Sequence, residues 1–277
     1  MGHGRDDGSP RRALGSAPRA SRFANEPAGL TLTQHAVAFV KELSAVVIGA
    51  VIVASLLRGF VGQMFLIPSS SMENTLVRDD RVIVEKLSDV RRGEVIVFAN
   101  PGGWLTGSVP PRRGAIGKAF QFVGVLPDTS TEHLIKRVVG LPGDQVVCCD
   151  AQGRVSVNGQ PLDEASYLYR APDGTLAAPS GIPFDVVVPS GHIFVLGDNR
   201  AHSRDSRCHL NDVQAGSVKG GNAFVAEDLV VGRGLAVVWP LGRTHRLPIP
   251  DTFGAVPAAG SPAPETAQIH AGPEANC

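Results

Sequence analysis

The sequence carries no excess of charge of either sign. Its 277 residues include 26 Lys plus Arg and 26 Asp plus Glu, so the formal net charge at pH 7 is zero. Proteins that bind nucleic acids usually carry a basic stripe, and this balance gives no support for a nucleic-acid partner. The sequence also shows no internal repeats.

Two motifs that mark hydrolases are absent as well. The chain contains neither GxSxG, which surrounds the nucleophilic serine of α/β-hydrolases, nor the zinc-binding HExxH. Its eight histidines form no pattern that by itself indicates a Ser-His-Asp triad. Lysine is the other base that a nucleophilic serine can use.

Only one long apolar run occurs. Residues 43–57 contain no charge, Arg58 interrupts the run, and mostly apolar residues continue to Pro68. Since a membrane span needs about 20 residues, we expect a transmembrane helix over 37–65, with Arg58 reaching the headgroups. The alternative is a cleaved signal peptide, but more than 40 residues precede the run and no A-x-A-like cleavage site follows it.

Basic residues before the apolar run predict the orientation of the span. The positive-inside rule places the N-terminus in the cytoplasm and the rest of the chain outside, in a single-pass protein of the plasma membrane. Residues 1–36 and 250–277 lack clear hydrophobic periodicity, so we expect a disordered tail at each end. The basic residues are Arg5, Arg11, Arg12, Arg19, Arg22 and Lys41.

Beyond the span the pattern changes to short runs rich in Val and Ile. We expect a mostly β domain over 66–249, on one N-terminal transmembrane helix. Residues 101–131 indicate a long loop or insertion, whose apolar part either touches the membrane or forms a short helix. Turn signals separate the runs, which predict strands at 81–86, 94–99, 133–139, 144–149, 154–158, 184–188, 192–198 and 229–239.

Three consecutive serines, 69–71, follow the span directly. A serine is a poor nucleophile until a base takes its proton. Lys136 lies in the predicted strand 133–139, where alternation places it on one face with Leu134 and Val138. Burial disfavours the charged form of a lysine and lowers its pKa, which makes it a usable base. A lysine that snorkels at a sheet edge is the ordinary alternative.

A charged segment, "GDNRAHSRDSR" at 197–207, holds two carboxylates, three arginines and two serines. A surface charge cluster is its ordinary interpretation. Taken with "PSSSMENTL", "DDRVIVEK" and "KRVVGLPGD", however, it resembles the bacterial type I signal peptidases, which are membrane-anchored Ser-Lys endopeptidases. The four blocks follow the family's order after a membrane span, and the resemblance extends over residues 40–245.

The resemblance implies a catalytic site. Ser71 corresponds to the nucleophile and Lys136 to the general base, while the hydroxyl of Ser69 and the backbone N–H of Ser71 correspond to the oxyanion donors. Ser203 corresponds to a serine that orients the lysine. Charged residues that brace the site correspond to Arg137, Asp198, Arg200, Asp205 and Arg207. Pocket-lining positions correspond to Phe65, Ile67, Met72, Leu76, Val82, Leu134 and Ile135, several of which we expect to be ordinary core.

Two positions depart from the family pattern. The family usually has Gly where Ser70 stands, and commonly Pro where Asn74 stands. Because serine lacks the freedom of glycine at positive φ, the turn must be reachable by an ordinary residue. Neither departure removes a reacting group.

The resemblance also implies the reaction and the partners. The substrates are exported preproteins with small residues at positions −1 and −3, and their signal peptides are removed at the outer face of the membrane. The reaction is acyl transfer to Ser71 and hydrolysis of the ester, with neither metal nor cofactor. The other partner is the lipid bilayer.

The cysteines then lie outside the cytoplasm, where disulfides persist. Cys148 and Cys149 are adjacent and point to opposite faces of a regular strand, so at most one of them faces Cys208. A bridge from Cys208 to one of the pair and a free pair in the core both remain open.

Two other functions stay in view. A self-cleaving repressor is also a Ser-Lys peptidase, but it needs a DNA-binding helix-turn-helix where this chain has its apolar run. A non-enzymatic, membrane-anchored β domain leaves Ser71 and Lys136 without a role.

Overall fold

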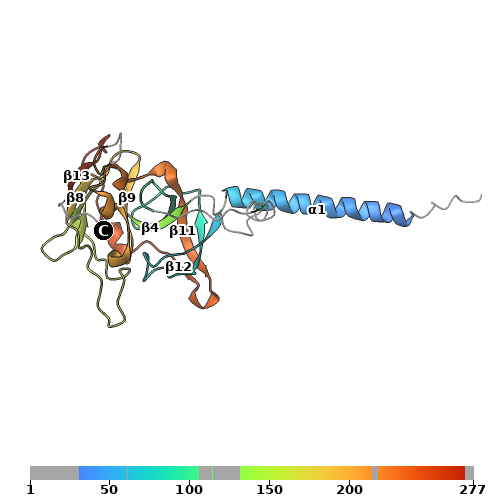
Figure 1. Cartoon of the computed structure of the whole chain (residues 1–277), viewed down its shortest axis with the longest axis horizontal. Helices are drawn as coiled ribbons and strands as arrows, with labels where there is room; N and C mark the ends of the chain where they lie inside the picture. The colour runs from blue at the N-terminus through green and yellow to red at the C-terminus, as the bar shows by residue number, and fades with distance from the viewer. Residues whose placement is uncertain (1–30, 61, 106–113, 115–131, 214–217, 272–277) are drawn as a thin grey trace, which may run out of the picture. The chain divides into compact units, whose positions relative to one another are not determined.

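The protein is mostly β, with one long N-terminal helix (Figure 1). The computed structural model describes residues 31–60, 62–105, 114, 132–213 and 218–271. The predicted fold class is confirmed. Most of the predicted loop or insertion at 101–131 lies outside the described residues, so its contact with a membrane stays a prediction.

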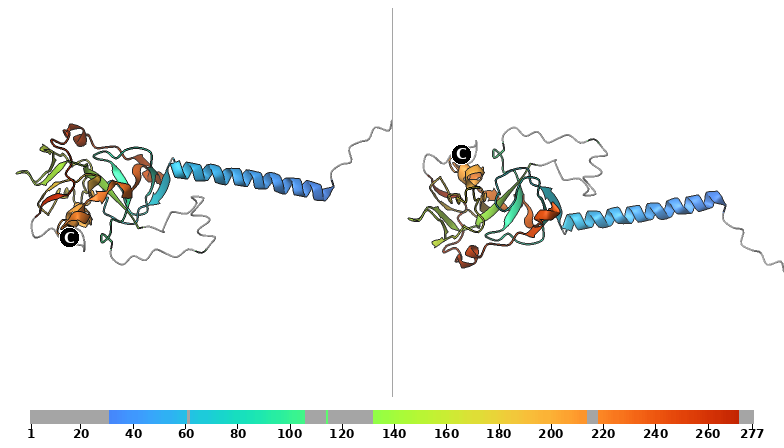
Figure 2. Two further views of the ribbon diagram at one scale, coloured as in Figure 1. Left: turned by 90° about the horizontal axis from the view of Figure 1, so that it is seen from above. Right: turned by 90° about the horizontal axis from the view of Figure 1, so that it is seen from below.

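Helix α1, Leu32–Phe60, is one continuous helix in both views of Figure 2. Its segment Leu32–Ala54 is long and apolar enough to cross a membrane. At 1.5 Å per residue, these 23 residues extend about 34 Å, against about 30 Å for the hydrocarbon core of a bilayer. The side chain of Arg58 lies outside the described part of the chain, so its contact with headgroups stays a prediction.

The expected bounds of the span, 37–65, are wrong at both ends. The helix already begins at Leu32, and residues 63–65 belong to strand β1, Gln63–Leu66. The backbone of β1 pairs with the next strand, and Phe65 is buried while Met64 and Leu66 are exposed. This alternation is that of a half-buried strand, which ends the helix before residue 63.

The larger sheet is antiparallel and has the order β1-β2-β11-β3-β4-β9-β10, with β12 also paired to β11. Five of the predicted strands lie in it, because runs of Val and Ile favour a pleated, buried surface. Strand β4 lies inside this sheet, between β3 and β9. The bounds are β2 Arg81–Glu85, β3 Val95–Ala99, β4 His133–Gly140, β9 His192–Leu196, β10 Val225–Ala226, β11 Val230–Trp239 and β12 His245–Arg246.

The smaller sheet has the order β13-β8-β5-β6-β7. Asn158 and Gly159 connect β6 to β7 with φ values of 51° and 79°, as the Asn-Gly pair predicts for a tight hairpin. The bounds are β5 Gln145–Cys148, β6 Val155–Val157, β7 Gln160–Pro161, β8 Phe184–Val187 and β13 Gln268–Ala271. Short 3-10 helices are η1 Arg200–His202, η2 Ser206–His209, η3 Gly221–Ala223, η4 Glu227–Leu229, η5 Leu241–Arg243 and η6 Asp251–Ala255.

Strand β3 is buried on both faces, and so it separates two apolar clusters. Val95 and Val97 pack in a cluster with β1 and β2, whereas Ile96 and Phe98 pack in one with β4 and β9. A third cluster joins the two sheets, since it includes Phe184 of β8 together with residues of β9.

The expected disordered tail at 250–277 is wrong for residues 251–271. Helix η6 buries Phe253, whose ring stacks on Tyr167, and β13 pairs with β8. Between them, the carbonyl of Pro264 accepts a hydrogen bond from the N–H of Ser190. This segment lacks hydrophobic periodicity because isolated buried side chains and backbone hydrogen bonds attach it to the rest of the domain. Residues 272–277 lie outside the described part.

Candidate active site

Ser71 lies in the connection from β1 to β2, and backbone hydrogen bonds join the two ends of this connection. The N–H of Ile67 donates to the carbonyl of Asp80, and the N–H of Asp79 donates to the carbonyl of Ile67, both at 2.9 Å. Met72 and Leu76 are completely buried, and each such side chain contributes about 1.5–3 kcal/mol through burial. These contacts fix the turn that presents Ser71.

Ser70 does not need the freedom of a glycine. The residues other than glycine that have a positive φ in the described part of the chain are Asp79 and Asn158. The backbone at Ser70 is therefore accessible to an ordinary residue, as the departure from the family pattern requires.

Lys136 comes from β4 and reaches the serine. Its side chain is 3% exposed, and its Nζ lies 2.6 Å from Ser71 Oγ. Nζ also donates to the carbonyl of Ile135 at 3.1 Å. Since β4 is an interior strand, Lys136 is not a snorkelling lysine at a sheet edge.

Burial lowers the pKa of Lys136 from 10.5 to about 8. The negative charges of Asp205 and Asp198 oppose this shift, and the positive charge of Arg207 adds to it. A substantial fraction of the side chain is thus neutral near pH 8. A neutral amine at hydrogen-bond distance from a hydroxyl can take its proton.

Ser69 and Ser203 lie in the same site. Ser69 Oγ is 3.3 Å from Ser71 Oγ. Ser203 lies close to the carbonyl of Ser71, because a Cβ on Gly197 would overlap both of them. The Ser203 hydroxyl is buried and makes no hydrogen bond to Lys136, so the predicted bond is not formed in this structure. The roles of both serines stay predictions.

The predicted bracing residues form buried ion pairs around Ser71 and Lys136. Arg137 binds Asp198 through Nε–Oδ1 at 2.9 Å and Nη2–Oδ2 at 2.6 Å. Arg207 binds Asp205 through two contacts of 2.8 Å, and Asp205 accepts a hydrogen bond from the N–H of Gly197. Burial disfavours the charge of Asp205, but Arg207 and the other hydrogen bonds to the carboxylate together outweigh burial and lower its pKa.

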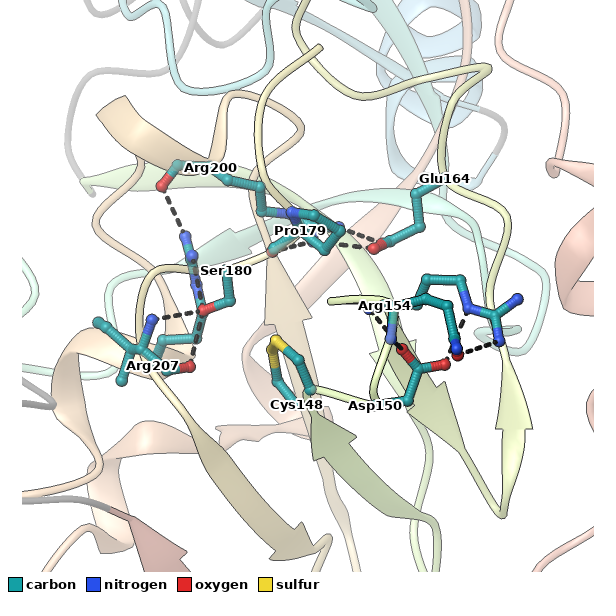
Figure 3. The surroundings of a disulfide bond; sticks show 11 residues. Cys148, Asp150, Arg154, Glu164, Pro179, Ser180, Arg200 and Arg207 are labelled. Atoms are coloured by element: carbon teal, nitrogen blue, oxygen red, sulfur yellow. Dashed lines mark hydrogen bonds and ion pairs between the residues drawn. A yellow bond between two sulfur atoms is a disulfide. The ribbon is translucent and has the colours of Figure 1, made fainter.

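Arg200 binds a carboxylate that sequence reasoning missed. Figure 3 shows its guanidinium against Glu164, with Nη2–Oε1 at 2.5 Å, and its carbonyl accepting from Arg207. The hydroxyl of Tyr167 donates to the same Glu164 at 2.6 Å, and the ring of Tyr167 lies under the guanidinium of Arg137. No motif marks Glu164 or Tyr167, because they lie in the connection from β7 to β8.

The predicted pocket residues are all buried. Six of them pack in one cluster with β2 and β3, while Leu134 packs in the cluster of β4 and β9. Ile67, Met72, Leu76 and Val82 are at most 1% exposed, which fits ordinary core. Phe65, Leu134 and Ile135 retain 6–9% exposure, and their contact with substrate stays a prediction.

The structure joins Cys148 to Cys149 in a disulfide, so neither of them is bonded to Cys208. Figure 3 shows the surroundings of this disulfide. The two cysteines do not point to opposite faces of one strand, because β5 ends at Cys148 and Cys149 lies outside the regular strand. Within the residues described, no group of three or more His, Cys, Asp or Glu side chains has the arrangement of a metal site.

The fold and the site define a mostly β protein with one apolar N-terminal helix and a buried serine–lysine pair. The family model for "Signal peptidase, peptidase S26" matches residues 40–239. This chain therefore belongs to the peptidase S26 family of signal peptidases.

Its relatives carry the same description. A signal peptidase I from Mycobacterium tuberculosis is 35% identical over 223 residues, which are 73% of this chain and 74% of that protein. A probable signal peptidase I-2 from Synechocystis is 37% identical over 211 residues, 74% of this chain and 76% of that protein. A crystal structure of a signal peptidase I from Enterococcus faecalis is 20% identical and covers 53% of this chain and 97% of that one, but its TM-score of 0.26 carries no argument.

Proposed function

We propose that this protein is an endopeptidase that removes N-terminal signal peptides from exported preproteins. The observation that carries the proposal is the 2.6 Å contact between Ser71 Oγ and Lys136 Nζ, made by a lysine whose pKa burial lowers to about 8. Membership of the S26 family supports the same reaction.

The reaction begins with a proton transfer. Neutral Lys136 takes the proton of Ser71, and Oγ attacks the carbonyl carbon of the residue before the cleavage site. The oxyanion is bound by the hydroxyl of Ser69 and the N–H of Ser71. The ammonium of Lys136 then protonates the leaving amine.

The second half of the reaction releases the product. Lys136, neutral again, takes a proton from water, and the water oxygen attacks the ester carbonyl. The C–Oγ bond breaks, and Ser71 recovers its proton. The arginine–carboxylate pairs around the site make no bond to substrate in this scheme; they hold the reacting groups in place.

The same proposal places the domain beyond α1 outside the cytoplasm, against the outer face of the plasma membrane. An apolar strip on the larger sheet supports contact with lipid: Met64 and Leu66 of β1, Ile83 of β2 and Trp239 of β11 are 38–49% exposed. Met64 pairs with Ile83, and both Leu66 and Trp239 pair with Arg81. Tryptophan is enriched at membrane interfaces.

The test is cleavage of a purified preprotein in detergent by the full chain. We expect the wild type to release the signal peptide, and Ser71→Ala to leave the preprotein intact. A serine-directed acylating probe should label Ser71 stoichiometrically in the wild type. Absence of both cleavage and labelling would support a non-enzymatic anchored domain instead.

The substrate series in the same assay tests the preference for small residues at −1 and −3. Replacing Ala at −1 by Trp should lower the cleavage rate by about tenfold or more, because overfilling an apolar pocket typically costs about 1–3 kcal/mol. Equal rates for Ala and Trp would contradict the expected pocket, while leaving the Ser71 assignment intact.

A further inference from the structure

Thr75 connects the turn of the nucleophile to a buried carboxylate. It lies four residues after Ser71, at the end of the turn 71–75. Its hydroxyl donates a hydrogen bond of 2.5 Å to Oδ2 of Asp198. Asp198 is completely buried, so its carboxylate depends on protein donors rather than on water.

The same carboxylate also holds the strand of the base. Arg137 directly follows Lys136 in β4, and it binds both carboxylate oxygens of Asp198. Arg137 Nη1 in turn donates to the carbonyl of Gly93 at 2.7 Å, which ties the guanidinium to the segment just before β3. The turn of Ser71 and the strand of Lys136 are thus both bound to the carboxylate of Asp198.

A second bond fixes the other end of the turn. The N–H of Asn199, next to Asp198, donates to the carbonyl of Ser71 at 3.0 Å. Residues 198–199 therefore hold the turn at Ser71 and at Thr75. With two attachment points, the turn cannot rotate about either one alone.

We propose that Thr75 is a positioning residue, whose hydroxyl acts through Asp198 and Arg137 to hold Ser71 at hydrogen-bond distance from Lys136. This inference rests on the proposed function. Precise placement matters because a displacement of about 1 Å between reacting groups can lower a rate by about a hundredfold. The ordinary alternative is that the hydroxyl only satisfies a buried carboxylate and contributes to stability.

The pKa of Lys136 distinguishes a positioning role of Thr75 from a purely stabilising one. The negative charge of Asp198 raises the pKa of Lys136, against the effect of burial. Asp205 acts in the same sense, and Arg207 acts against it. Removing the Thr75 donor leaves the charge of Asp198 less compensated, so the pKa of Lys136 should rise. A loss of stability alone does not move that pKa.

The experiment compares Thr75→Val, which keeps the shape and loses the hydroxyl, with Thr75→Ser, which keeps the hydroxyl. Both are assayed as the full chain in detergent on the same preprotein. We expect Thr75→Val to lower kcat by about tenfold or more with little change in KM, and to move the acid limb of the pH–rate profile to higher pH. Thr75→Ser should stay within about threefold of the wild type.

The matched control is Thr252→Val, which removes a hydroxyl that accepts one hydrogen bond, from the N–H of Asp163. It should leave kcat and the acid limb unchanged. If Thr75→Val does not fold, Thr75→Ala takes its place, because Thr75 borders a cleft of about 380 Å³ and is not enclosed on all sides.

Three results would overturn the inference: a Thr75→Val enzyme with wild-type kcat and acid limb, an equal loss in Thr75→Ser, or a lower kcat with an unmoved acid limb. The last two would assign Thr75 a structural role alone. Failure of the proposed function is distinguishable, because the wild type itself would then not cleave the preprotein.

Discussion

The guanidinium of Arg200 and the carboxylate of Glu164 form a buried ion pair that joins two parts of the chain 36 residues apart. Arg200 belongs to the segment that carries Ser203, and Glu164 to the connection between β7 and β8. Both side chains are 2% exposed. The pair thereby attaches the connection between β7 and β8 of the smaller sheet to the candidate site.

Glu164→Gln should destabilise the protein strongly. It leaves the charge of Arg200 buried without its partner, which typically costs about 3–5 kcal/mol. Urea unfolding of the full chain in detergent measures the loss. The double change Glu164→Leu with Arg200→Met, which removes both charges, should recover part of it. A Glu164→Gln protein as stable as the wild type would show that the pair contributes little.

Lys136→Arg should be nearly inactive although its positive charge is kept, because arginine does not release its proton. The wild-type rate should rise with pH along a limb set by the pKa of Lys136, about 8. Preprotein cleavage from pH 6 to 10 measures both, with circular dichroism as a check on folding. Lys219→Arg, at an exposed position, is the matched control and should keep full activity. A folded Lys136→Arg enzyme with wild-type rate would redirect the search for a base to His202.

Lys136 should also make stability depend on pH. Its pKa is about 8 in the folded protein and 10.5 without burial, so the unfolded chain binds more protons between these values. Stability therefore rises with pH across that window. From pH 7 to pH 10 the wild type should gain about 2 kcal/mol relative to Lys136→Met, which lacks the amine. If the free energy of unfolding changed with pH equally in the two proteins, the pKa of the lysine would be unshifted in the folded state.

The domain beyond α1 should face outward, since the basic residues precede the span. Protease added to intact spheroplasts should digest this domain and spare a tag at the N-terminus. The control is the same digestion after lysis, in which both should be cut. Protection of the domain with loss of the tag would reverse the orientation.

Local sequence patterns determined much of the architecture, and the resemblance to a family supplied the two candidate reacting residues. Runs of Val and Ile predicted the strands β2, β3, β4, β9 and β11. A strand buried on one face shows alternating apolar residues in the sequence, and a strand buried on both faces shows a continuous apolar run. The order of four short blocks pointed to Ser71 and Lys136. The single apolar run predicted helix α1.

Only the tertiary structure revealed further polar residues around Ser71 and Lys136. Glu164 and Thr75 are polar residues with no periodicity of their own, and their partners Arg200 and Asp198 are 36 and 123 positions away. The lowered pKa of Lys136 depends on its place in an interior strand, since burial is the cause of the shift. Residues 251–271 looked disordered because their few anchors, such as Phe253, stabilise the segment only when the two sheets they contact have formed. Pairings over such distances follow from chain topology, which no local pattern of residues contains.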